Sequence, residues 1–551
     1  MLFIILYLQK LPHKTLKKFL LLFLFIFSFF RAQYSIPTTE RNALVAIFNQ
    51  TNGQNWAQIW DISQDSFYWK GVKISNGHVT ELNLNGNLLS GEFPTAILSL
   101  TNLQKLDVSS NKLTGNVPNL SVLINLKYLN ISNNSLSGDV FSSFSSLSNL
   151  EEIYVGDNAF TFSSTDFSGF TQLSILDIAN CGFTAVPPSL QNLKSLNISR
   201  NQISDYNNLS TIPNLEELKI SGNQLTAIPS VIGSLTKLKT LDASNNSLTQ
   251  FATLTNLTQL EWLSLENNAL QNVPSEIQNL QKLIHLNLGR NLLTSGFSTI
   301  SALPKLEQLW LNHNQISGSF PTEILSSPHL MSLSVQSNNI SGSIPSNIPE
   351  ICNISNNRFT ASEIETYLNQ KPNNTDFVYS PQRYDELKTE KAAINSSVTL
   401  HQLLSSSDGY AFNWYKNLDQ NIGVNSENYT INSVQETDFA DYTCEAILIR
   451  NNTLYVLNFA DFREPISLKN TLSTNDVNEK LLAIYPNPVE DFLHIISKNY
   501  KIEQVSIFDL TGKLIYSGKD TTINMQKLPS SNYILNIKTP EGFHNFKILK
   551  K

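Results

Sequence analysis

From Val79 onward, apolar residues recur in short units in which leucine or a similar residue fills the first, fourth and sixth places and asparagine usually fills the ninth. Around the fourth and sixth places apolar and polar residues alternate, which predicts a short strand with one buried face. A single unit cannot bury these side chains, so the pattern predicts stacked units with a continuous core under a parallel sheet. The units begin at residues 79, 103, 126, 150, 173, 193, 215, 238, 260, 283, 306, 330 and 349.

The asparagine at the ninth place is predicted to lie inside the turn after each strand, where its amide satisfies backbone groups of its own and neighbouring turns. This ladder comprises Asn87, Asn111, Asn134, Asn158, Asn201, Asn223, Asn246, Asn268, Asn291, Asn314, Asn338 and Asn357. Cys181 fills the same place in the fifth unit, and Cys352 fills a leucine place in the last unit. Both thiols are predicted to be buried, unpaired and structural.

Several units continue in the pattern L-x-G-x-[I/F/V]-P, as in Leu89-Ser-Gly-Glu-Phe-Pro94. Glycine and proline exclude a long helix there, so extended or 3₁₀ segments are expected on the back of the array. These units resemble leucine-rich repeats, partly of the plant-type subclass and partly of the shorter bacterial forms. The resemblance implies an open, curved array whose concave face carries the outward side chains of the third, fifth, seventh and eighth places.

Both ends of such an array need caps, because terminal repeats would expose the core. Residues 36–48 have the pattern of an amphipathic helix, with Thr38 or Thr39 as its N-cap. Trp56, Trp60 and Trp69 are predicted to form the core of this cap. The segment resembles the N-terminal cap of leucine-rich-repeat receptors without its cysteine pair, and residues 362–369 are predicted to form the closing helix.

Residues 376–465 contain Trp414 and, after it, the pattern D-x-A-x-Y-x-C that ends at Cys444. This order resembles an immunoglobulin-type sandwich, with Tyr442 at the position of the tyrosine corner. The partner cysteine is absent, and Leu400 lies near its place. Cys444 is therefore predicted to be a buried free thiol packed near Trp414.

The C-terminal segment begins with Tyr485-Pro-Asn-Pro488 and ends in Lys547-Ile-Leu-Lys-Lys551. Its alternating pattern predicts a small antiparallel β domain with turns at 511–512 and 517–518. The motifs resemble the C-terminal sorting domain of the type IX (Por) secretion system of Bacteroidetes. The resemblance implies export, contact with the type IX secretion machinery, and release of the chain or its attachment at the cell surface.

At the other end, Lys14, Lys17 and Lys18 precede about 12 mostly apolar residues, which predicts a signal peptide over residues 1–32. An uncleaved membrane anchor is the alternative, and no transmembrane segment is expected in the mature chain. Lys+Arg is 38 and Asp+Glu is 45; without residues 1–32 the balance is 33 to 45, a net charge of −12. An acidic chain without a basic block argues against a nucleic-acid partner.

Catalytic chemistry has no recognisable motif in this sequence: it lacks H-E-x-x-H, G-x-S-x-G, G-x-G-x-x-G, a G-K-[S/T] loop, C-x-x-C and a calcium loop. Three cysteines in 551 residues also exclude a disulfide scaffold. The chain is predicted not to be an enzyme and to need no cofactor or metal. An enzyme with an unrecognised site stays an alternative, because catalytic groups assemble in space.

Two clusters on the concave face are candidate ligand-binding residues, because exposed Trp and Arg are enriched among binding hot spots. The larger cluster, in the ninth to eleventh units, comprises Trp262, Glu266, His285, Arg290, Trp310, Asn312 and His313. The smaller cluster comprises Tyr128, Glu152, Tyr154 and Asp157. The alternative interpretation is that these aromatic residues only stabilise neighbouring strands by cross-strand packing.

The predicted fold is mainly β, with a leucine-rich-repeat solenoid followed by an immunoglobulin-like sandwich and a small C-terminal antiparallel β-sandwich. The predicted segments are 1–32 (signal peptide), 33–77 (N-terminal cap), 78–370 (about 13 repeats), 371–465 (immunoglobulin-like), 466–480 (linker) and 481–551 (sorting domain). The predicted function is that of a secreted or surface-attached recognition or adhesion protein that binds a protein or glycan on the concave face. A self-associating surface-layer protein is a further alternative.

Overall fold

The computed structural model describes residues 36–161, 167–249, 254–372, 374–471, 482–485, 489, 491–497, 501–509, 513–540 and 542–551. The predicted signal peptide lies outside these residues. The chain divides into two compact units. The first comprises Met1–Tyr384 with Ile447–Phe462, and the second comprises Asp385–Ala446 with Arg463–Lys551.

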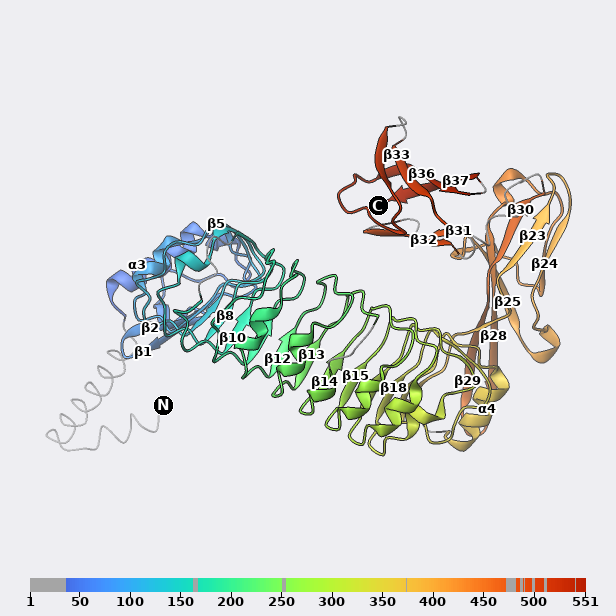
Figure 1. Ribbon diagram of the computed structural model, residues 1–551, viewed down its shortest axis with the longest axis horizontal. Helices are drawn as coiled ribbons and strands as arrows, with labels where there is room; N and C mark the ends of the chain where they lie inside the picture. Colours follow the sequence, from blue (N-terminus) through green and yellow to red (C-terminus); the bar gives the residue numbers. More distant parts are fainter. Residues whose placement is uncertain are drawn as a thin grey trace, which may run out of the picture. The chain divides into compact units, whose positions relative to one another are not determined.

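The first unit is built on one sheet, whose strands follow one another along the array (Figure 1). The first two strands pair antiparallel and the later ones pair parallel, as the stacked units predict. Within the described residues its strands, in spatial order, are β1 (Val72–Ser75), β2 (His78–Asn83), β4 (Lys105–Asp107), β6 (Tyr128–Asn130), β8 (Glu152–Tyr154), β10 (Ile175–Asp177), β11 (Ser195–Asn197), β12 (Glu217–Lys219), β13 (Thr240–Asp242), β14 (Trp262–Ser264), β15 (His285–Asn287), β16 (Gln308–Trp310), β18 (Ser332–Ser334), β20 (Ile351–Asn353) and β21 (Phe377–Val378).

The core of this unit follows the leucine pattern of the sequence. In a three-residue strand the middle side chain is buried and its two neighbours are partly exposed, as around Leu196, Leu218 and Leu309. These three leucines have 0% exposure. Stacked leucines from successive units thus form the continuous core that a single unit cannot provide.

The asparagine ladder is confirmed, and Asn201 shows how it works. Its Nδ2 donates to the carbonyls of Ile178, Ile198 and Ser199 at 2.9, 3.0 and 3.2 Å. Its Oδ1 accepts the N–H groups of two residues in the preceding unit, at 3.1 and 3.0 Å. Each rung therefore satisfies its own turn and ties it to the unit before.

The two cysteines of the repeats are buried, as predicted. Cys181 stands in the ladder, where its Sγ donates weakly to the carbonyls of Val155 and Ala179 at 3.5 and 3.4 Å. Cys352 is 1% exposed and occupies the core of β20. Burial raises the pKa of each thiol to about 12, so both behave as small apolar groups.

The back of the array consists of extended and 3₁₀ segments, as glycine and proline predict. Two short parallel sheets lie there, β3 (Ser90–Glu92), β5 (Lys112–Asn116), β7 (Ser135–Asp139), β9 (Ala159–Thr161) and β17 (Ser317–Gly318), β19 (Asn339–Ile340). The 3₁₀ segments of the array include η3 (Thr95–Ser99), η4 (Phe141–Ser143), η5 (Asn207–Thr211), η6 (Ser230–Ser234), η7 (Leu254–Asn256), η8 (Ser275–Asn279), η9 (Phe297–Ala302) and η10 (Thr322–Leu325).

The N-terminal cap consists of helix α3 (Thr38–Gln50) and the predicted tryptophan cluster. Trp60 lies between Trp56 and Trp69, with ring centroids 4.9 and 5.0 Å apart. The predicted N-cap is wrong: the helix begins directly after Pro37, without a side-chain capping bond. The fixed backbone angle of a proline suits a helix start, so neither threonine is needed there.

The C-terminal cap begins with helix α4 (Ala361–Gln370). A capping box formed by Thr360 and Glu363 satisfies backbone N–H groups at the N-terminus of this helix. The sheet continues beyond residue 370, the predicted end of the repeats, because β21 pairs parallel with β20. Gln382, which is fully buried, extends the ladder by one rung. Its Oε1 accepts the N–H groups of Asn357 and Phe359 at 3.1 and 3.2 Å.

Residues 447–462 fall within the predicted immunoglobulin-like segment but group with the first unit. The contacts explain this: Arg450 Nη1 lies 2.9 Å from Glu365 Oε2 on α4, and the Ala460 N–H donates to Ser380 Oγ at 2.9 Å. These residues belong to strands β28 (Asp441–Asn451) and β29 (Val456–Arg463). Residues of this segment thus contact the closing end of the repeats, while β28 and β29 also share one sheet with β25 and β26.

In the second unit, Trp414, Tyr442, Cys444 and Leu400 are fully buried. The Tyr442 hydroxyl donates to the Asp438 carbonyl at 2.8 Å, which is the bond expected of a tyrosine corner. The immunoglobulin-like assignment itself stays a prediction. Besides the first part of β28, which carries Tyr442 and Cys444, the described strands of this part are β23 (Lys388–Ala392), β24 (Val398–His401), β25 (Ala411–Lys416), β26 (Gln420–Asn421), β27 (Asn428–Ile431) and β30 (Ile466–Asn470).

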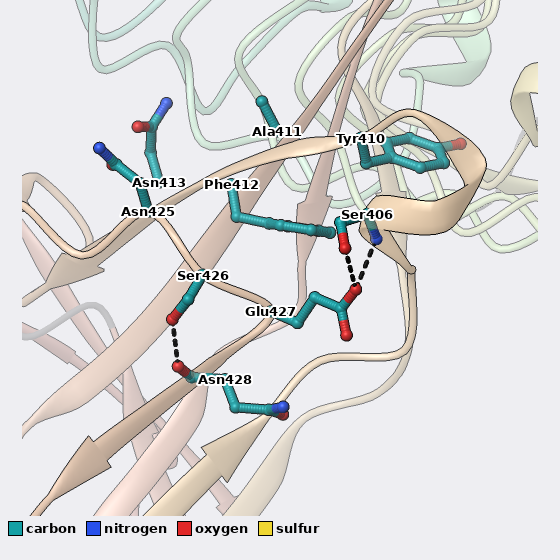
Figure 2. Close-up of a pocket in the computed structure, with 9 residues that line it drawn as sticks. All are labelled: Ser406, Tyr410, Ala411, Phe412, Asn413, Asn425, Ser426, Glu427 and Asn428. Carbon is teal, nitrogen blue, oxygen red and sulfur yellow. Dashed lines mark hydrogen bonds between the residues drawn. The ribbon is translucent and has the colours of Figure 1, made fainter.

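Two features of this unit differ from, or go beyond, the sequence expectation. Residues 466–480 were expected to be a linker, but Ile466–Asn470 form strand β30. This strand pairs parallel with β23 and buries Ile466 and Leu468. Residues 472–480 lie outside the described residues. Strands β25 and β27 also flank an open pocket (Figure 2).

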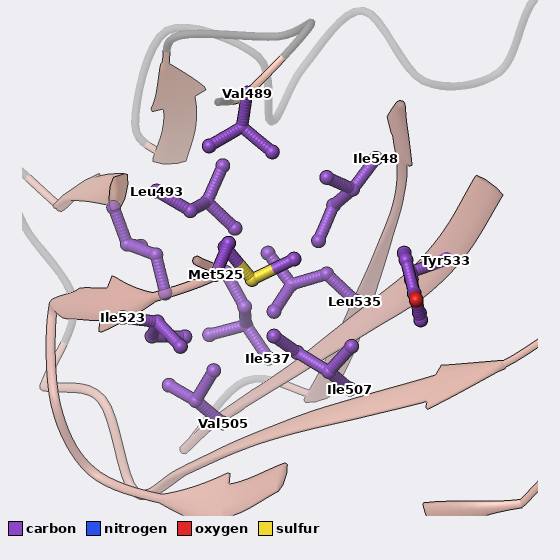
Figure 3. Close-up of a cluster of buried hydrophobic side chains, with 11 residues drawn as sticks. Val489, Leu493, Val505, Ile507, Ile523, Met525, Tyr533, Leu535, Ile537 and Ile548 are labelled. Carbon is purple, nitrogen blue, oxygen red and sulfur yellow. The ribbon is translucent and has the colours of Figure 1, made fainter. Parts of the chain in front are cut away.

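The C-terminal segment forms the predicted small antiparallel β domain. Its strands are β31 (Leu482–Tyr485), β32 (Phe492–Ser497), β35 (Thr522–Asn524) in one sheet and β34 (Leu514–Gly518), β33 (Gln504–Asp509), β36 (Ser531–Thr539), β37 (Gly542–Lys550) in the other. Figure 3 shows their buried aliphatic side chains gathered around Met525 and Leu535. The predicted turn at 517–518 is wrong, because Ser517 pairs with Ser506 inside a β ladder, and residues 511–512 lie outside the described residues.

Candidate ligand-binding face

The outward face of the long sheet is built from the third, fifth and seventh places of each unit. At the fifth place an asparagine or aspartate often accepts the N–H two residues later, as Asn287 does from Gly289 and Asn353 from Ser355, both at 3.0 Å. Such side chains hold the turn after the strand. They are therefore partly occupied before any ligand arrives, whereas Trp310 occupies the same place without this bond.

The eighth place belongs to the turn rather than to the sheet. Arg290 and His313 both have a φ of 54°, in the left-handed region. The same conformation recurs at this place in other units, which explains the frequent asparagine and glycine there. Two members of the predicted patch thus lie beside the outward face, at its edge.

The strand register separates the two tryptophans of the predicted patch. Trp262 pairs with His285, and the next residue in that row is Gln308. Trp310 belongs to the neighbouring row, where it pairs with Asn287 and Ser334. The two rings are therefore two strands and two residues apart, roughly 12 Å at the backbone.

A hollow of about 460 Å³ lies on the outward face around Trp310. Its lining comprises Glu266, Asn287, Trp310, Asn312, Ser332, Leu333, Ser334, Gln336, Ile351, Cys352, Asn353, Asp376 and Val378. The predicted residues Glu266, Trp310 and Asn312 line it together. Trp262, His285, Arg290 and His313 do not.

The polar groups around the hollow are partly paired with one another. Glu266 lies 3.5 Å from Arg290 and accepts a hydrogen bond from Asn287 Nδ2 at 3.0 Å. Partial burial and the positive charge of Arg290 lower the pKa of His313. The negative charge of Glu266 acts in the opposite direction but does not cancel this shift. The side-chain amide of Asn312 has no hydrogen bond to any described residue, so it is available to a ligand.

Sequence reasoning missed the apolar end of the hollow. Ile351 is 53% exposed and Val378 is 46% exposed, and both line it. Ile351 occupies the third place of the last unit, so its outward position was readable from the repeat. Val378 lies outside the repeat pattern and gave no such signal.

The smaller predicted cluster is held by contacts within the sheet. Tyr128 and Tyr154 lie with ring centroids 5.5 Å apart, and Lys105 Nζ lies 4.2 Å from the Tyr128 ring. The Tyr154 hydroxyl donates to Glu152 at 2.9 Å, and burial raises the pKa of both tyrosines. These aromatic side chains make the cross-strand contacts that the alternative interpretation expects.

Two features are absent from the described part of the chain. No group of three or more His, Cys, Asp or Glu side chains among the described residues is arranged to hold a metal ion. In the same part of the chain, no helix combines the length and the apolar character needed to cross a membrane.

The family comparisons agree with the architecture. Models of the leucine-rich repeat match residues 78–100, 102–121, 124–183, 189–205, 213–256, 258–316 and 329–351. A model described as a secretion system C-terminal sorting domain matches residues 483–551. The chain therefore contains leucine-rich repeats and a C-terminal sorting domain. The sorting domain indicates type IX secretion to the cell surface or the extracellular space.

Individual proteins are similar to parts of this chain. The probable inactive receptor kinase RLK902 of Arabidopsis thaliana is 37% identical over 81 residues. The match covers 14% of this chain and only 12% of the kinase. A leucine-rich-repeat protein of Leptospira interrogans is 27% identical with a TM-score of 0.46, covering 55% of this chain and 83% of that one. An internalin of Listeria monocytogenes is 23% identical with a TM-score of 0.46, covering 57% and 92%.

Proposed function

We propose that this chain is an exported recognition protein that binds a peptide segment of a protein ligand in the hollow around Trp310. The observation that carries the proposal is the composition of that hollow. It combines a half-buried indole, exposed aliphatic side chains and several amides on an outward sheet face. Such a mixture is typical of sites that anchor one apolar side chain and orient its backbone.

The chemistry of the lining favours a peptide with a neutral, apolar anchor residue. Apolar contact area comes from Trp310, Ile351 and Val378. The Asn312 amide and the Nε2 group of Gln336, whose Oε1 already accepts from Asn353, can pair with a peptide backbone. The charged residues that line the hollow, Glu266 and Asp376, are both acidic. An acidic anchor residue would therefore be repelled.

We infer that the hollow binds without catalysing a reaction. Its lining consists mainly of amides, hydroxyls and apolar groups, which bind ligands but do not exchange protons near neutral pH. Attachment at the cell surface would make such binding adhesive, whereas release would make the chain a soluble recognition factor. A glycan on this face remains the second ligand class, because amides also bind sugar hydroxyls.

A peptide selection tests this function. A phage-displayed random dodecapeptide library is panned on the full chain, and a selected peptide is titrated against Trp310→Ala and Trp262→Ala. The two tryptophans are matched, because both lie partly buried on the same sheet face and only Trp310 lines the hollow. We expect Trp310→Ala to weaken binding at least about 10-fold and Trp262→Ala to change it less than about 3-fold.

The contrary results are equally specific. Failure to select any peptide, or equal losses in both variants, would contradict the proposed site. Sedimentation of the same chain as concentration-dependent oligomers without peptide binding would favour the surface-layer alternative instead.

A further inference from the structure

The second unit contains an open pocket of about 690 Å³ at one end of its strands (Figure 2). It lies between η11 (Ser406–Asp408), β25, the segment 425–427 and β27. Its lining comprises Ser406, Tyr410, Ala411, Phe412, Asn413, Asn425, Ser426, Glu427 and Asn428. All of these residues belong to the second unit, so the pocket is independent of the hollow around Trp310.

Glu427 lines the pocket and is fixed by hydrogen bonds to one of its two carboxylate oxygens. Oε1 accepts the Ser406 N–H and hydroxyl, both at 2.6 Å, and the Ser405 hydroxyl at 3.0 Å. These bonds lower the pKa of the carboxyl group, so it is ionised near neutral pH. Oε2 has no hydrogen bond to a described residue and remains an oriented acceptor in the pocket.

Three asparagines also line the pocket: Asn413, Asn425 and Asn428. The Nδ2 of Asn413 donates a hydrogen bond to Glu445 Oε2 at 3.3 Å, and the Oδ1 of Asn428 is hydrogen-bonded to His401 Nδ1 at 2.8 Å. The other half of each amide makes no hydrogen bond within the described part of the chain. Asn425 is exposed, and its whole amide is similarly unengaged. The lining thus supplies both acceptors and donors.

One wall of the pocket is aromatic. The rings of Tyr410 and Phe412 are nearly parallel, with centroids 6.5 Å apart and an interplanar angle of 26°. Phe412 is buried beneath the pocket, while Tyr410 is half-buried at its rim. Phe412 is 4% exposed, so the accessible aromatic surface comes mainly from Tyr410, which offers apolar contact to a ligand whose other edges are polar.

We propose that this pocket binds a neutral saccharide. A sugar ring has one face of C–H groups, which fits the aromatic wall, and a rim of hydroxyls that each donate and accept. Amides and a carboxylate oxygen match those hydroxyls, because together they supply both roles. The pocket volume also lies within the range of small-molecule sites.

The charge of the lining restricts the class further. Glu427 is the one charged residue that lines the pocket, and it is negative. It would repel the carboxylate of a uronic or sialic acid, since no Lys or Arg lines the pocket to compensate. Neutral hexoses and their oligosaccharides are therefore the expected ligands.

The test uses the full chain on a printed panel of neutral hexose oligosaccharides beside uronic-acid oligosaccharides of similar length. We expect binding to at least one neutral glycan and weaker or no binding to the acidic ones. Asn425→Ala and Glu427→Gln are each expected to weaken the neutral signal at least about 10-fold. Asn425 is exposed and unengaged, so its variant leaves the fold intact.

Two controls fix the location of the site. Asn432→Ala removes another exposed asparagine of this unit that lies outside the pocket, and Trp310→Ala removes the anchor of the separate hollow. Both variants are expected to bind the glycan as the native chain does. The proposal is overturned if no neutral glycan binds, if acidic glycans bind better, or if binding survives both pocket variants.

Discussion

Replacing Asn291 by alanine is expected to destabilise the central repeats by about 3 kcal/mol. Its Nδ2 donates to the carbonyls of Leu265, Leu288 and Gly289 at 2.9, 3.1 and 3.1 Å, and its Oδ1 accepts the Leu270 N–H at 3.1 Å. The side chain is buried, with 5% exposure. The variant therefore removes four hydrogen bonds from the interior of the turn.

The four lost bonds do not cost equally. The carbonyls of Leu265, Leu288 and Gly289 each keep a second donor, from Asn268, Asn314 and the Asn267 N–H. The Leu270 N–H has no other partner among the described residues. Burying that unsatisfied N–H costs about 1–3 kcal/mol, and the three weakened carbonyls add about 1 kcal/mol more.

Native-state hydrogen exchange, read by mass spectrometry on peptides from residues 260–316, measures this loss locally. A loss of about 3 kcal/mol corresponds to roughly 150-fold faster exchange through local opening. Asn256→Ala is the matched control, because Asn256 is exposed and forms no side-chain hydrogen bond with the described residues. Exchange in the Asn291 variant no faster than in this control would refute the ladder as a source of stability.

Three further predictions concern buried groups. Burial raises the pKa of the thiols of Cys181, Cys352 and Cys444 to about 12. Iodoacetamide at pH 8 should therefore modify none of them until urea unfolds the chain. Tyr442→Phe should lower the stability of the second unit by about 1 kcal/mol, read as a lower midpoint of urea unfolding, because the bond to Asp438 is lost. Burial raises the pKa of Asp461 to about 7, so ionisation destabilises the fold as pH rises from about 4 to 7. The free energy of unfolding of Asp461→Asn, relative to that of the native chain, should therefore rise by about 2 kcal/mol between pH 5 and pH 8. The same relative stability at both pH values would contradict this assignment.

The repeats, their ladder and their buried cysteines were predictable because they depend on periodic contacts between neighbouring units. Most leucines and asparagines of the array meet the same residue type one unit away, so one unit predicts the next. Gln382 could not be predicted in the same way. It occupies the last rung from a segment without the repeat pattern, and only the folded chain brings it against Asn357.

The candidate site was only partly predictable, for a geometric reason. The sequence places Trp262 and Trp310 on the same face, but the third and fifth places form separate rows in the sheet. Proximity across the face depends on the row as well as the strand. The hollow also needs Val378, which joins the sheet through β21 beyond the last repeat.

The turn-holding bond at the fifth place offers a final test of how the array separates stability from binding. Where this place is Asn or Asp, the side chain often holds the next turn, as Asn287 does with Gly289. Trp310 leaves the N–H of Asn312 without a hydrogen bond to any described residue. Trp310→Asn should supply that bond, whereas Trp310→Ala should not.

Both variants lack the indole and should lose the selected peptide equally, but they should differ in stability. The local stability of Trp310→Asn is expected to exceed that of Trp310→Ala by about 1 kcal/mol. This difference should appear as slower hydrogen exchange in peptides that cover residues 306–316. Equal exchange in the two variants would show that the fifth place does not hold the turn. A stabilised variant without peptide binding would mean that the array gives up a turn bond where it presents a side chain to a ligand.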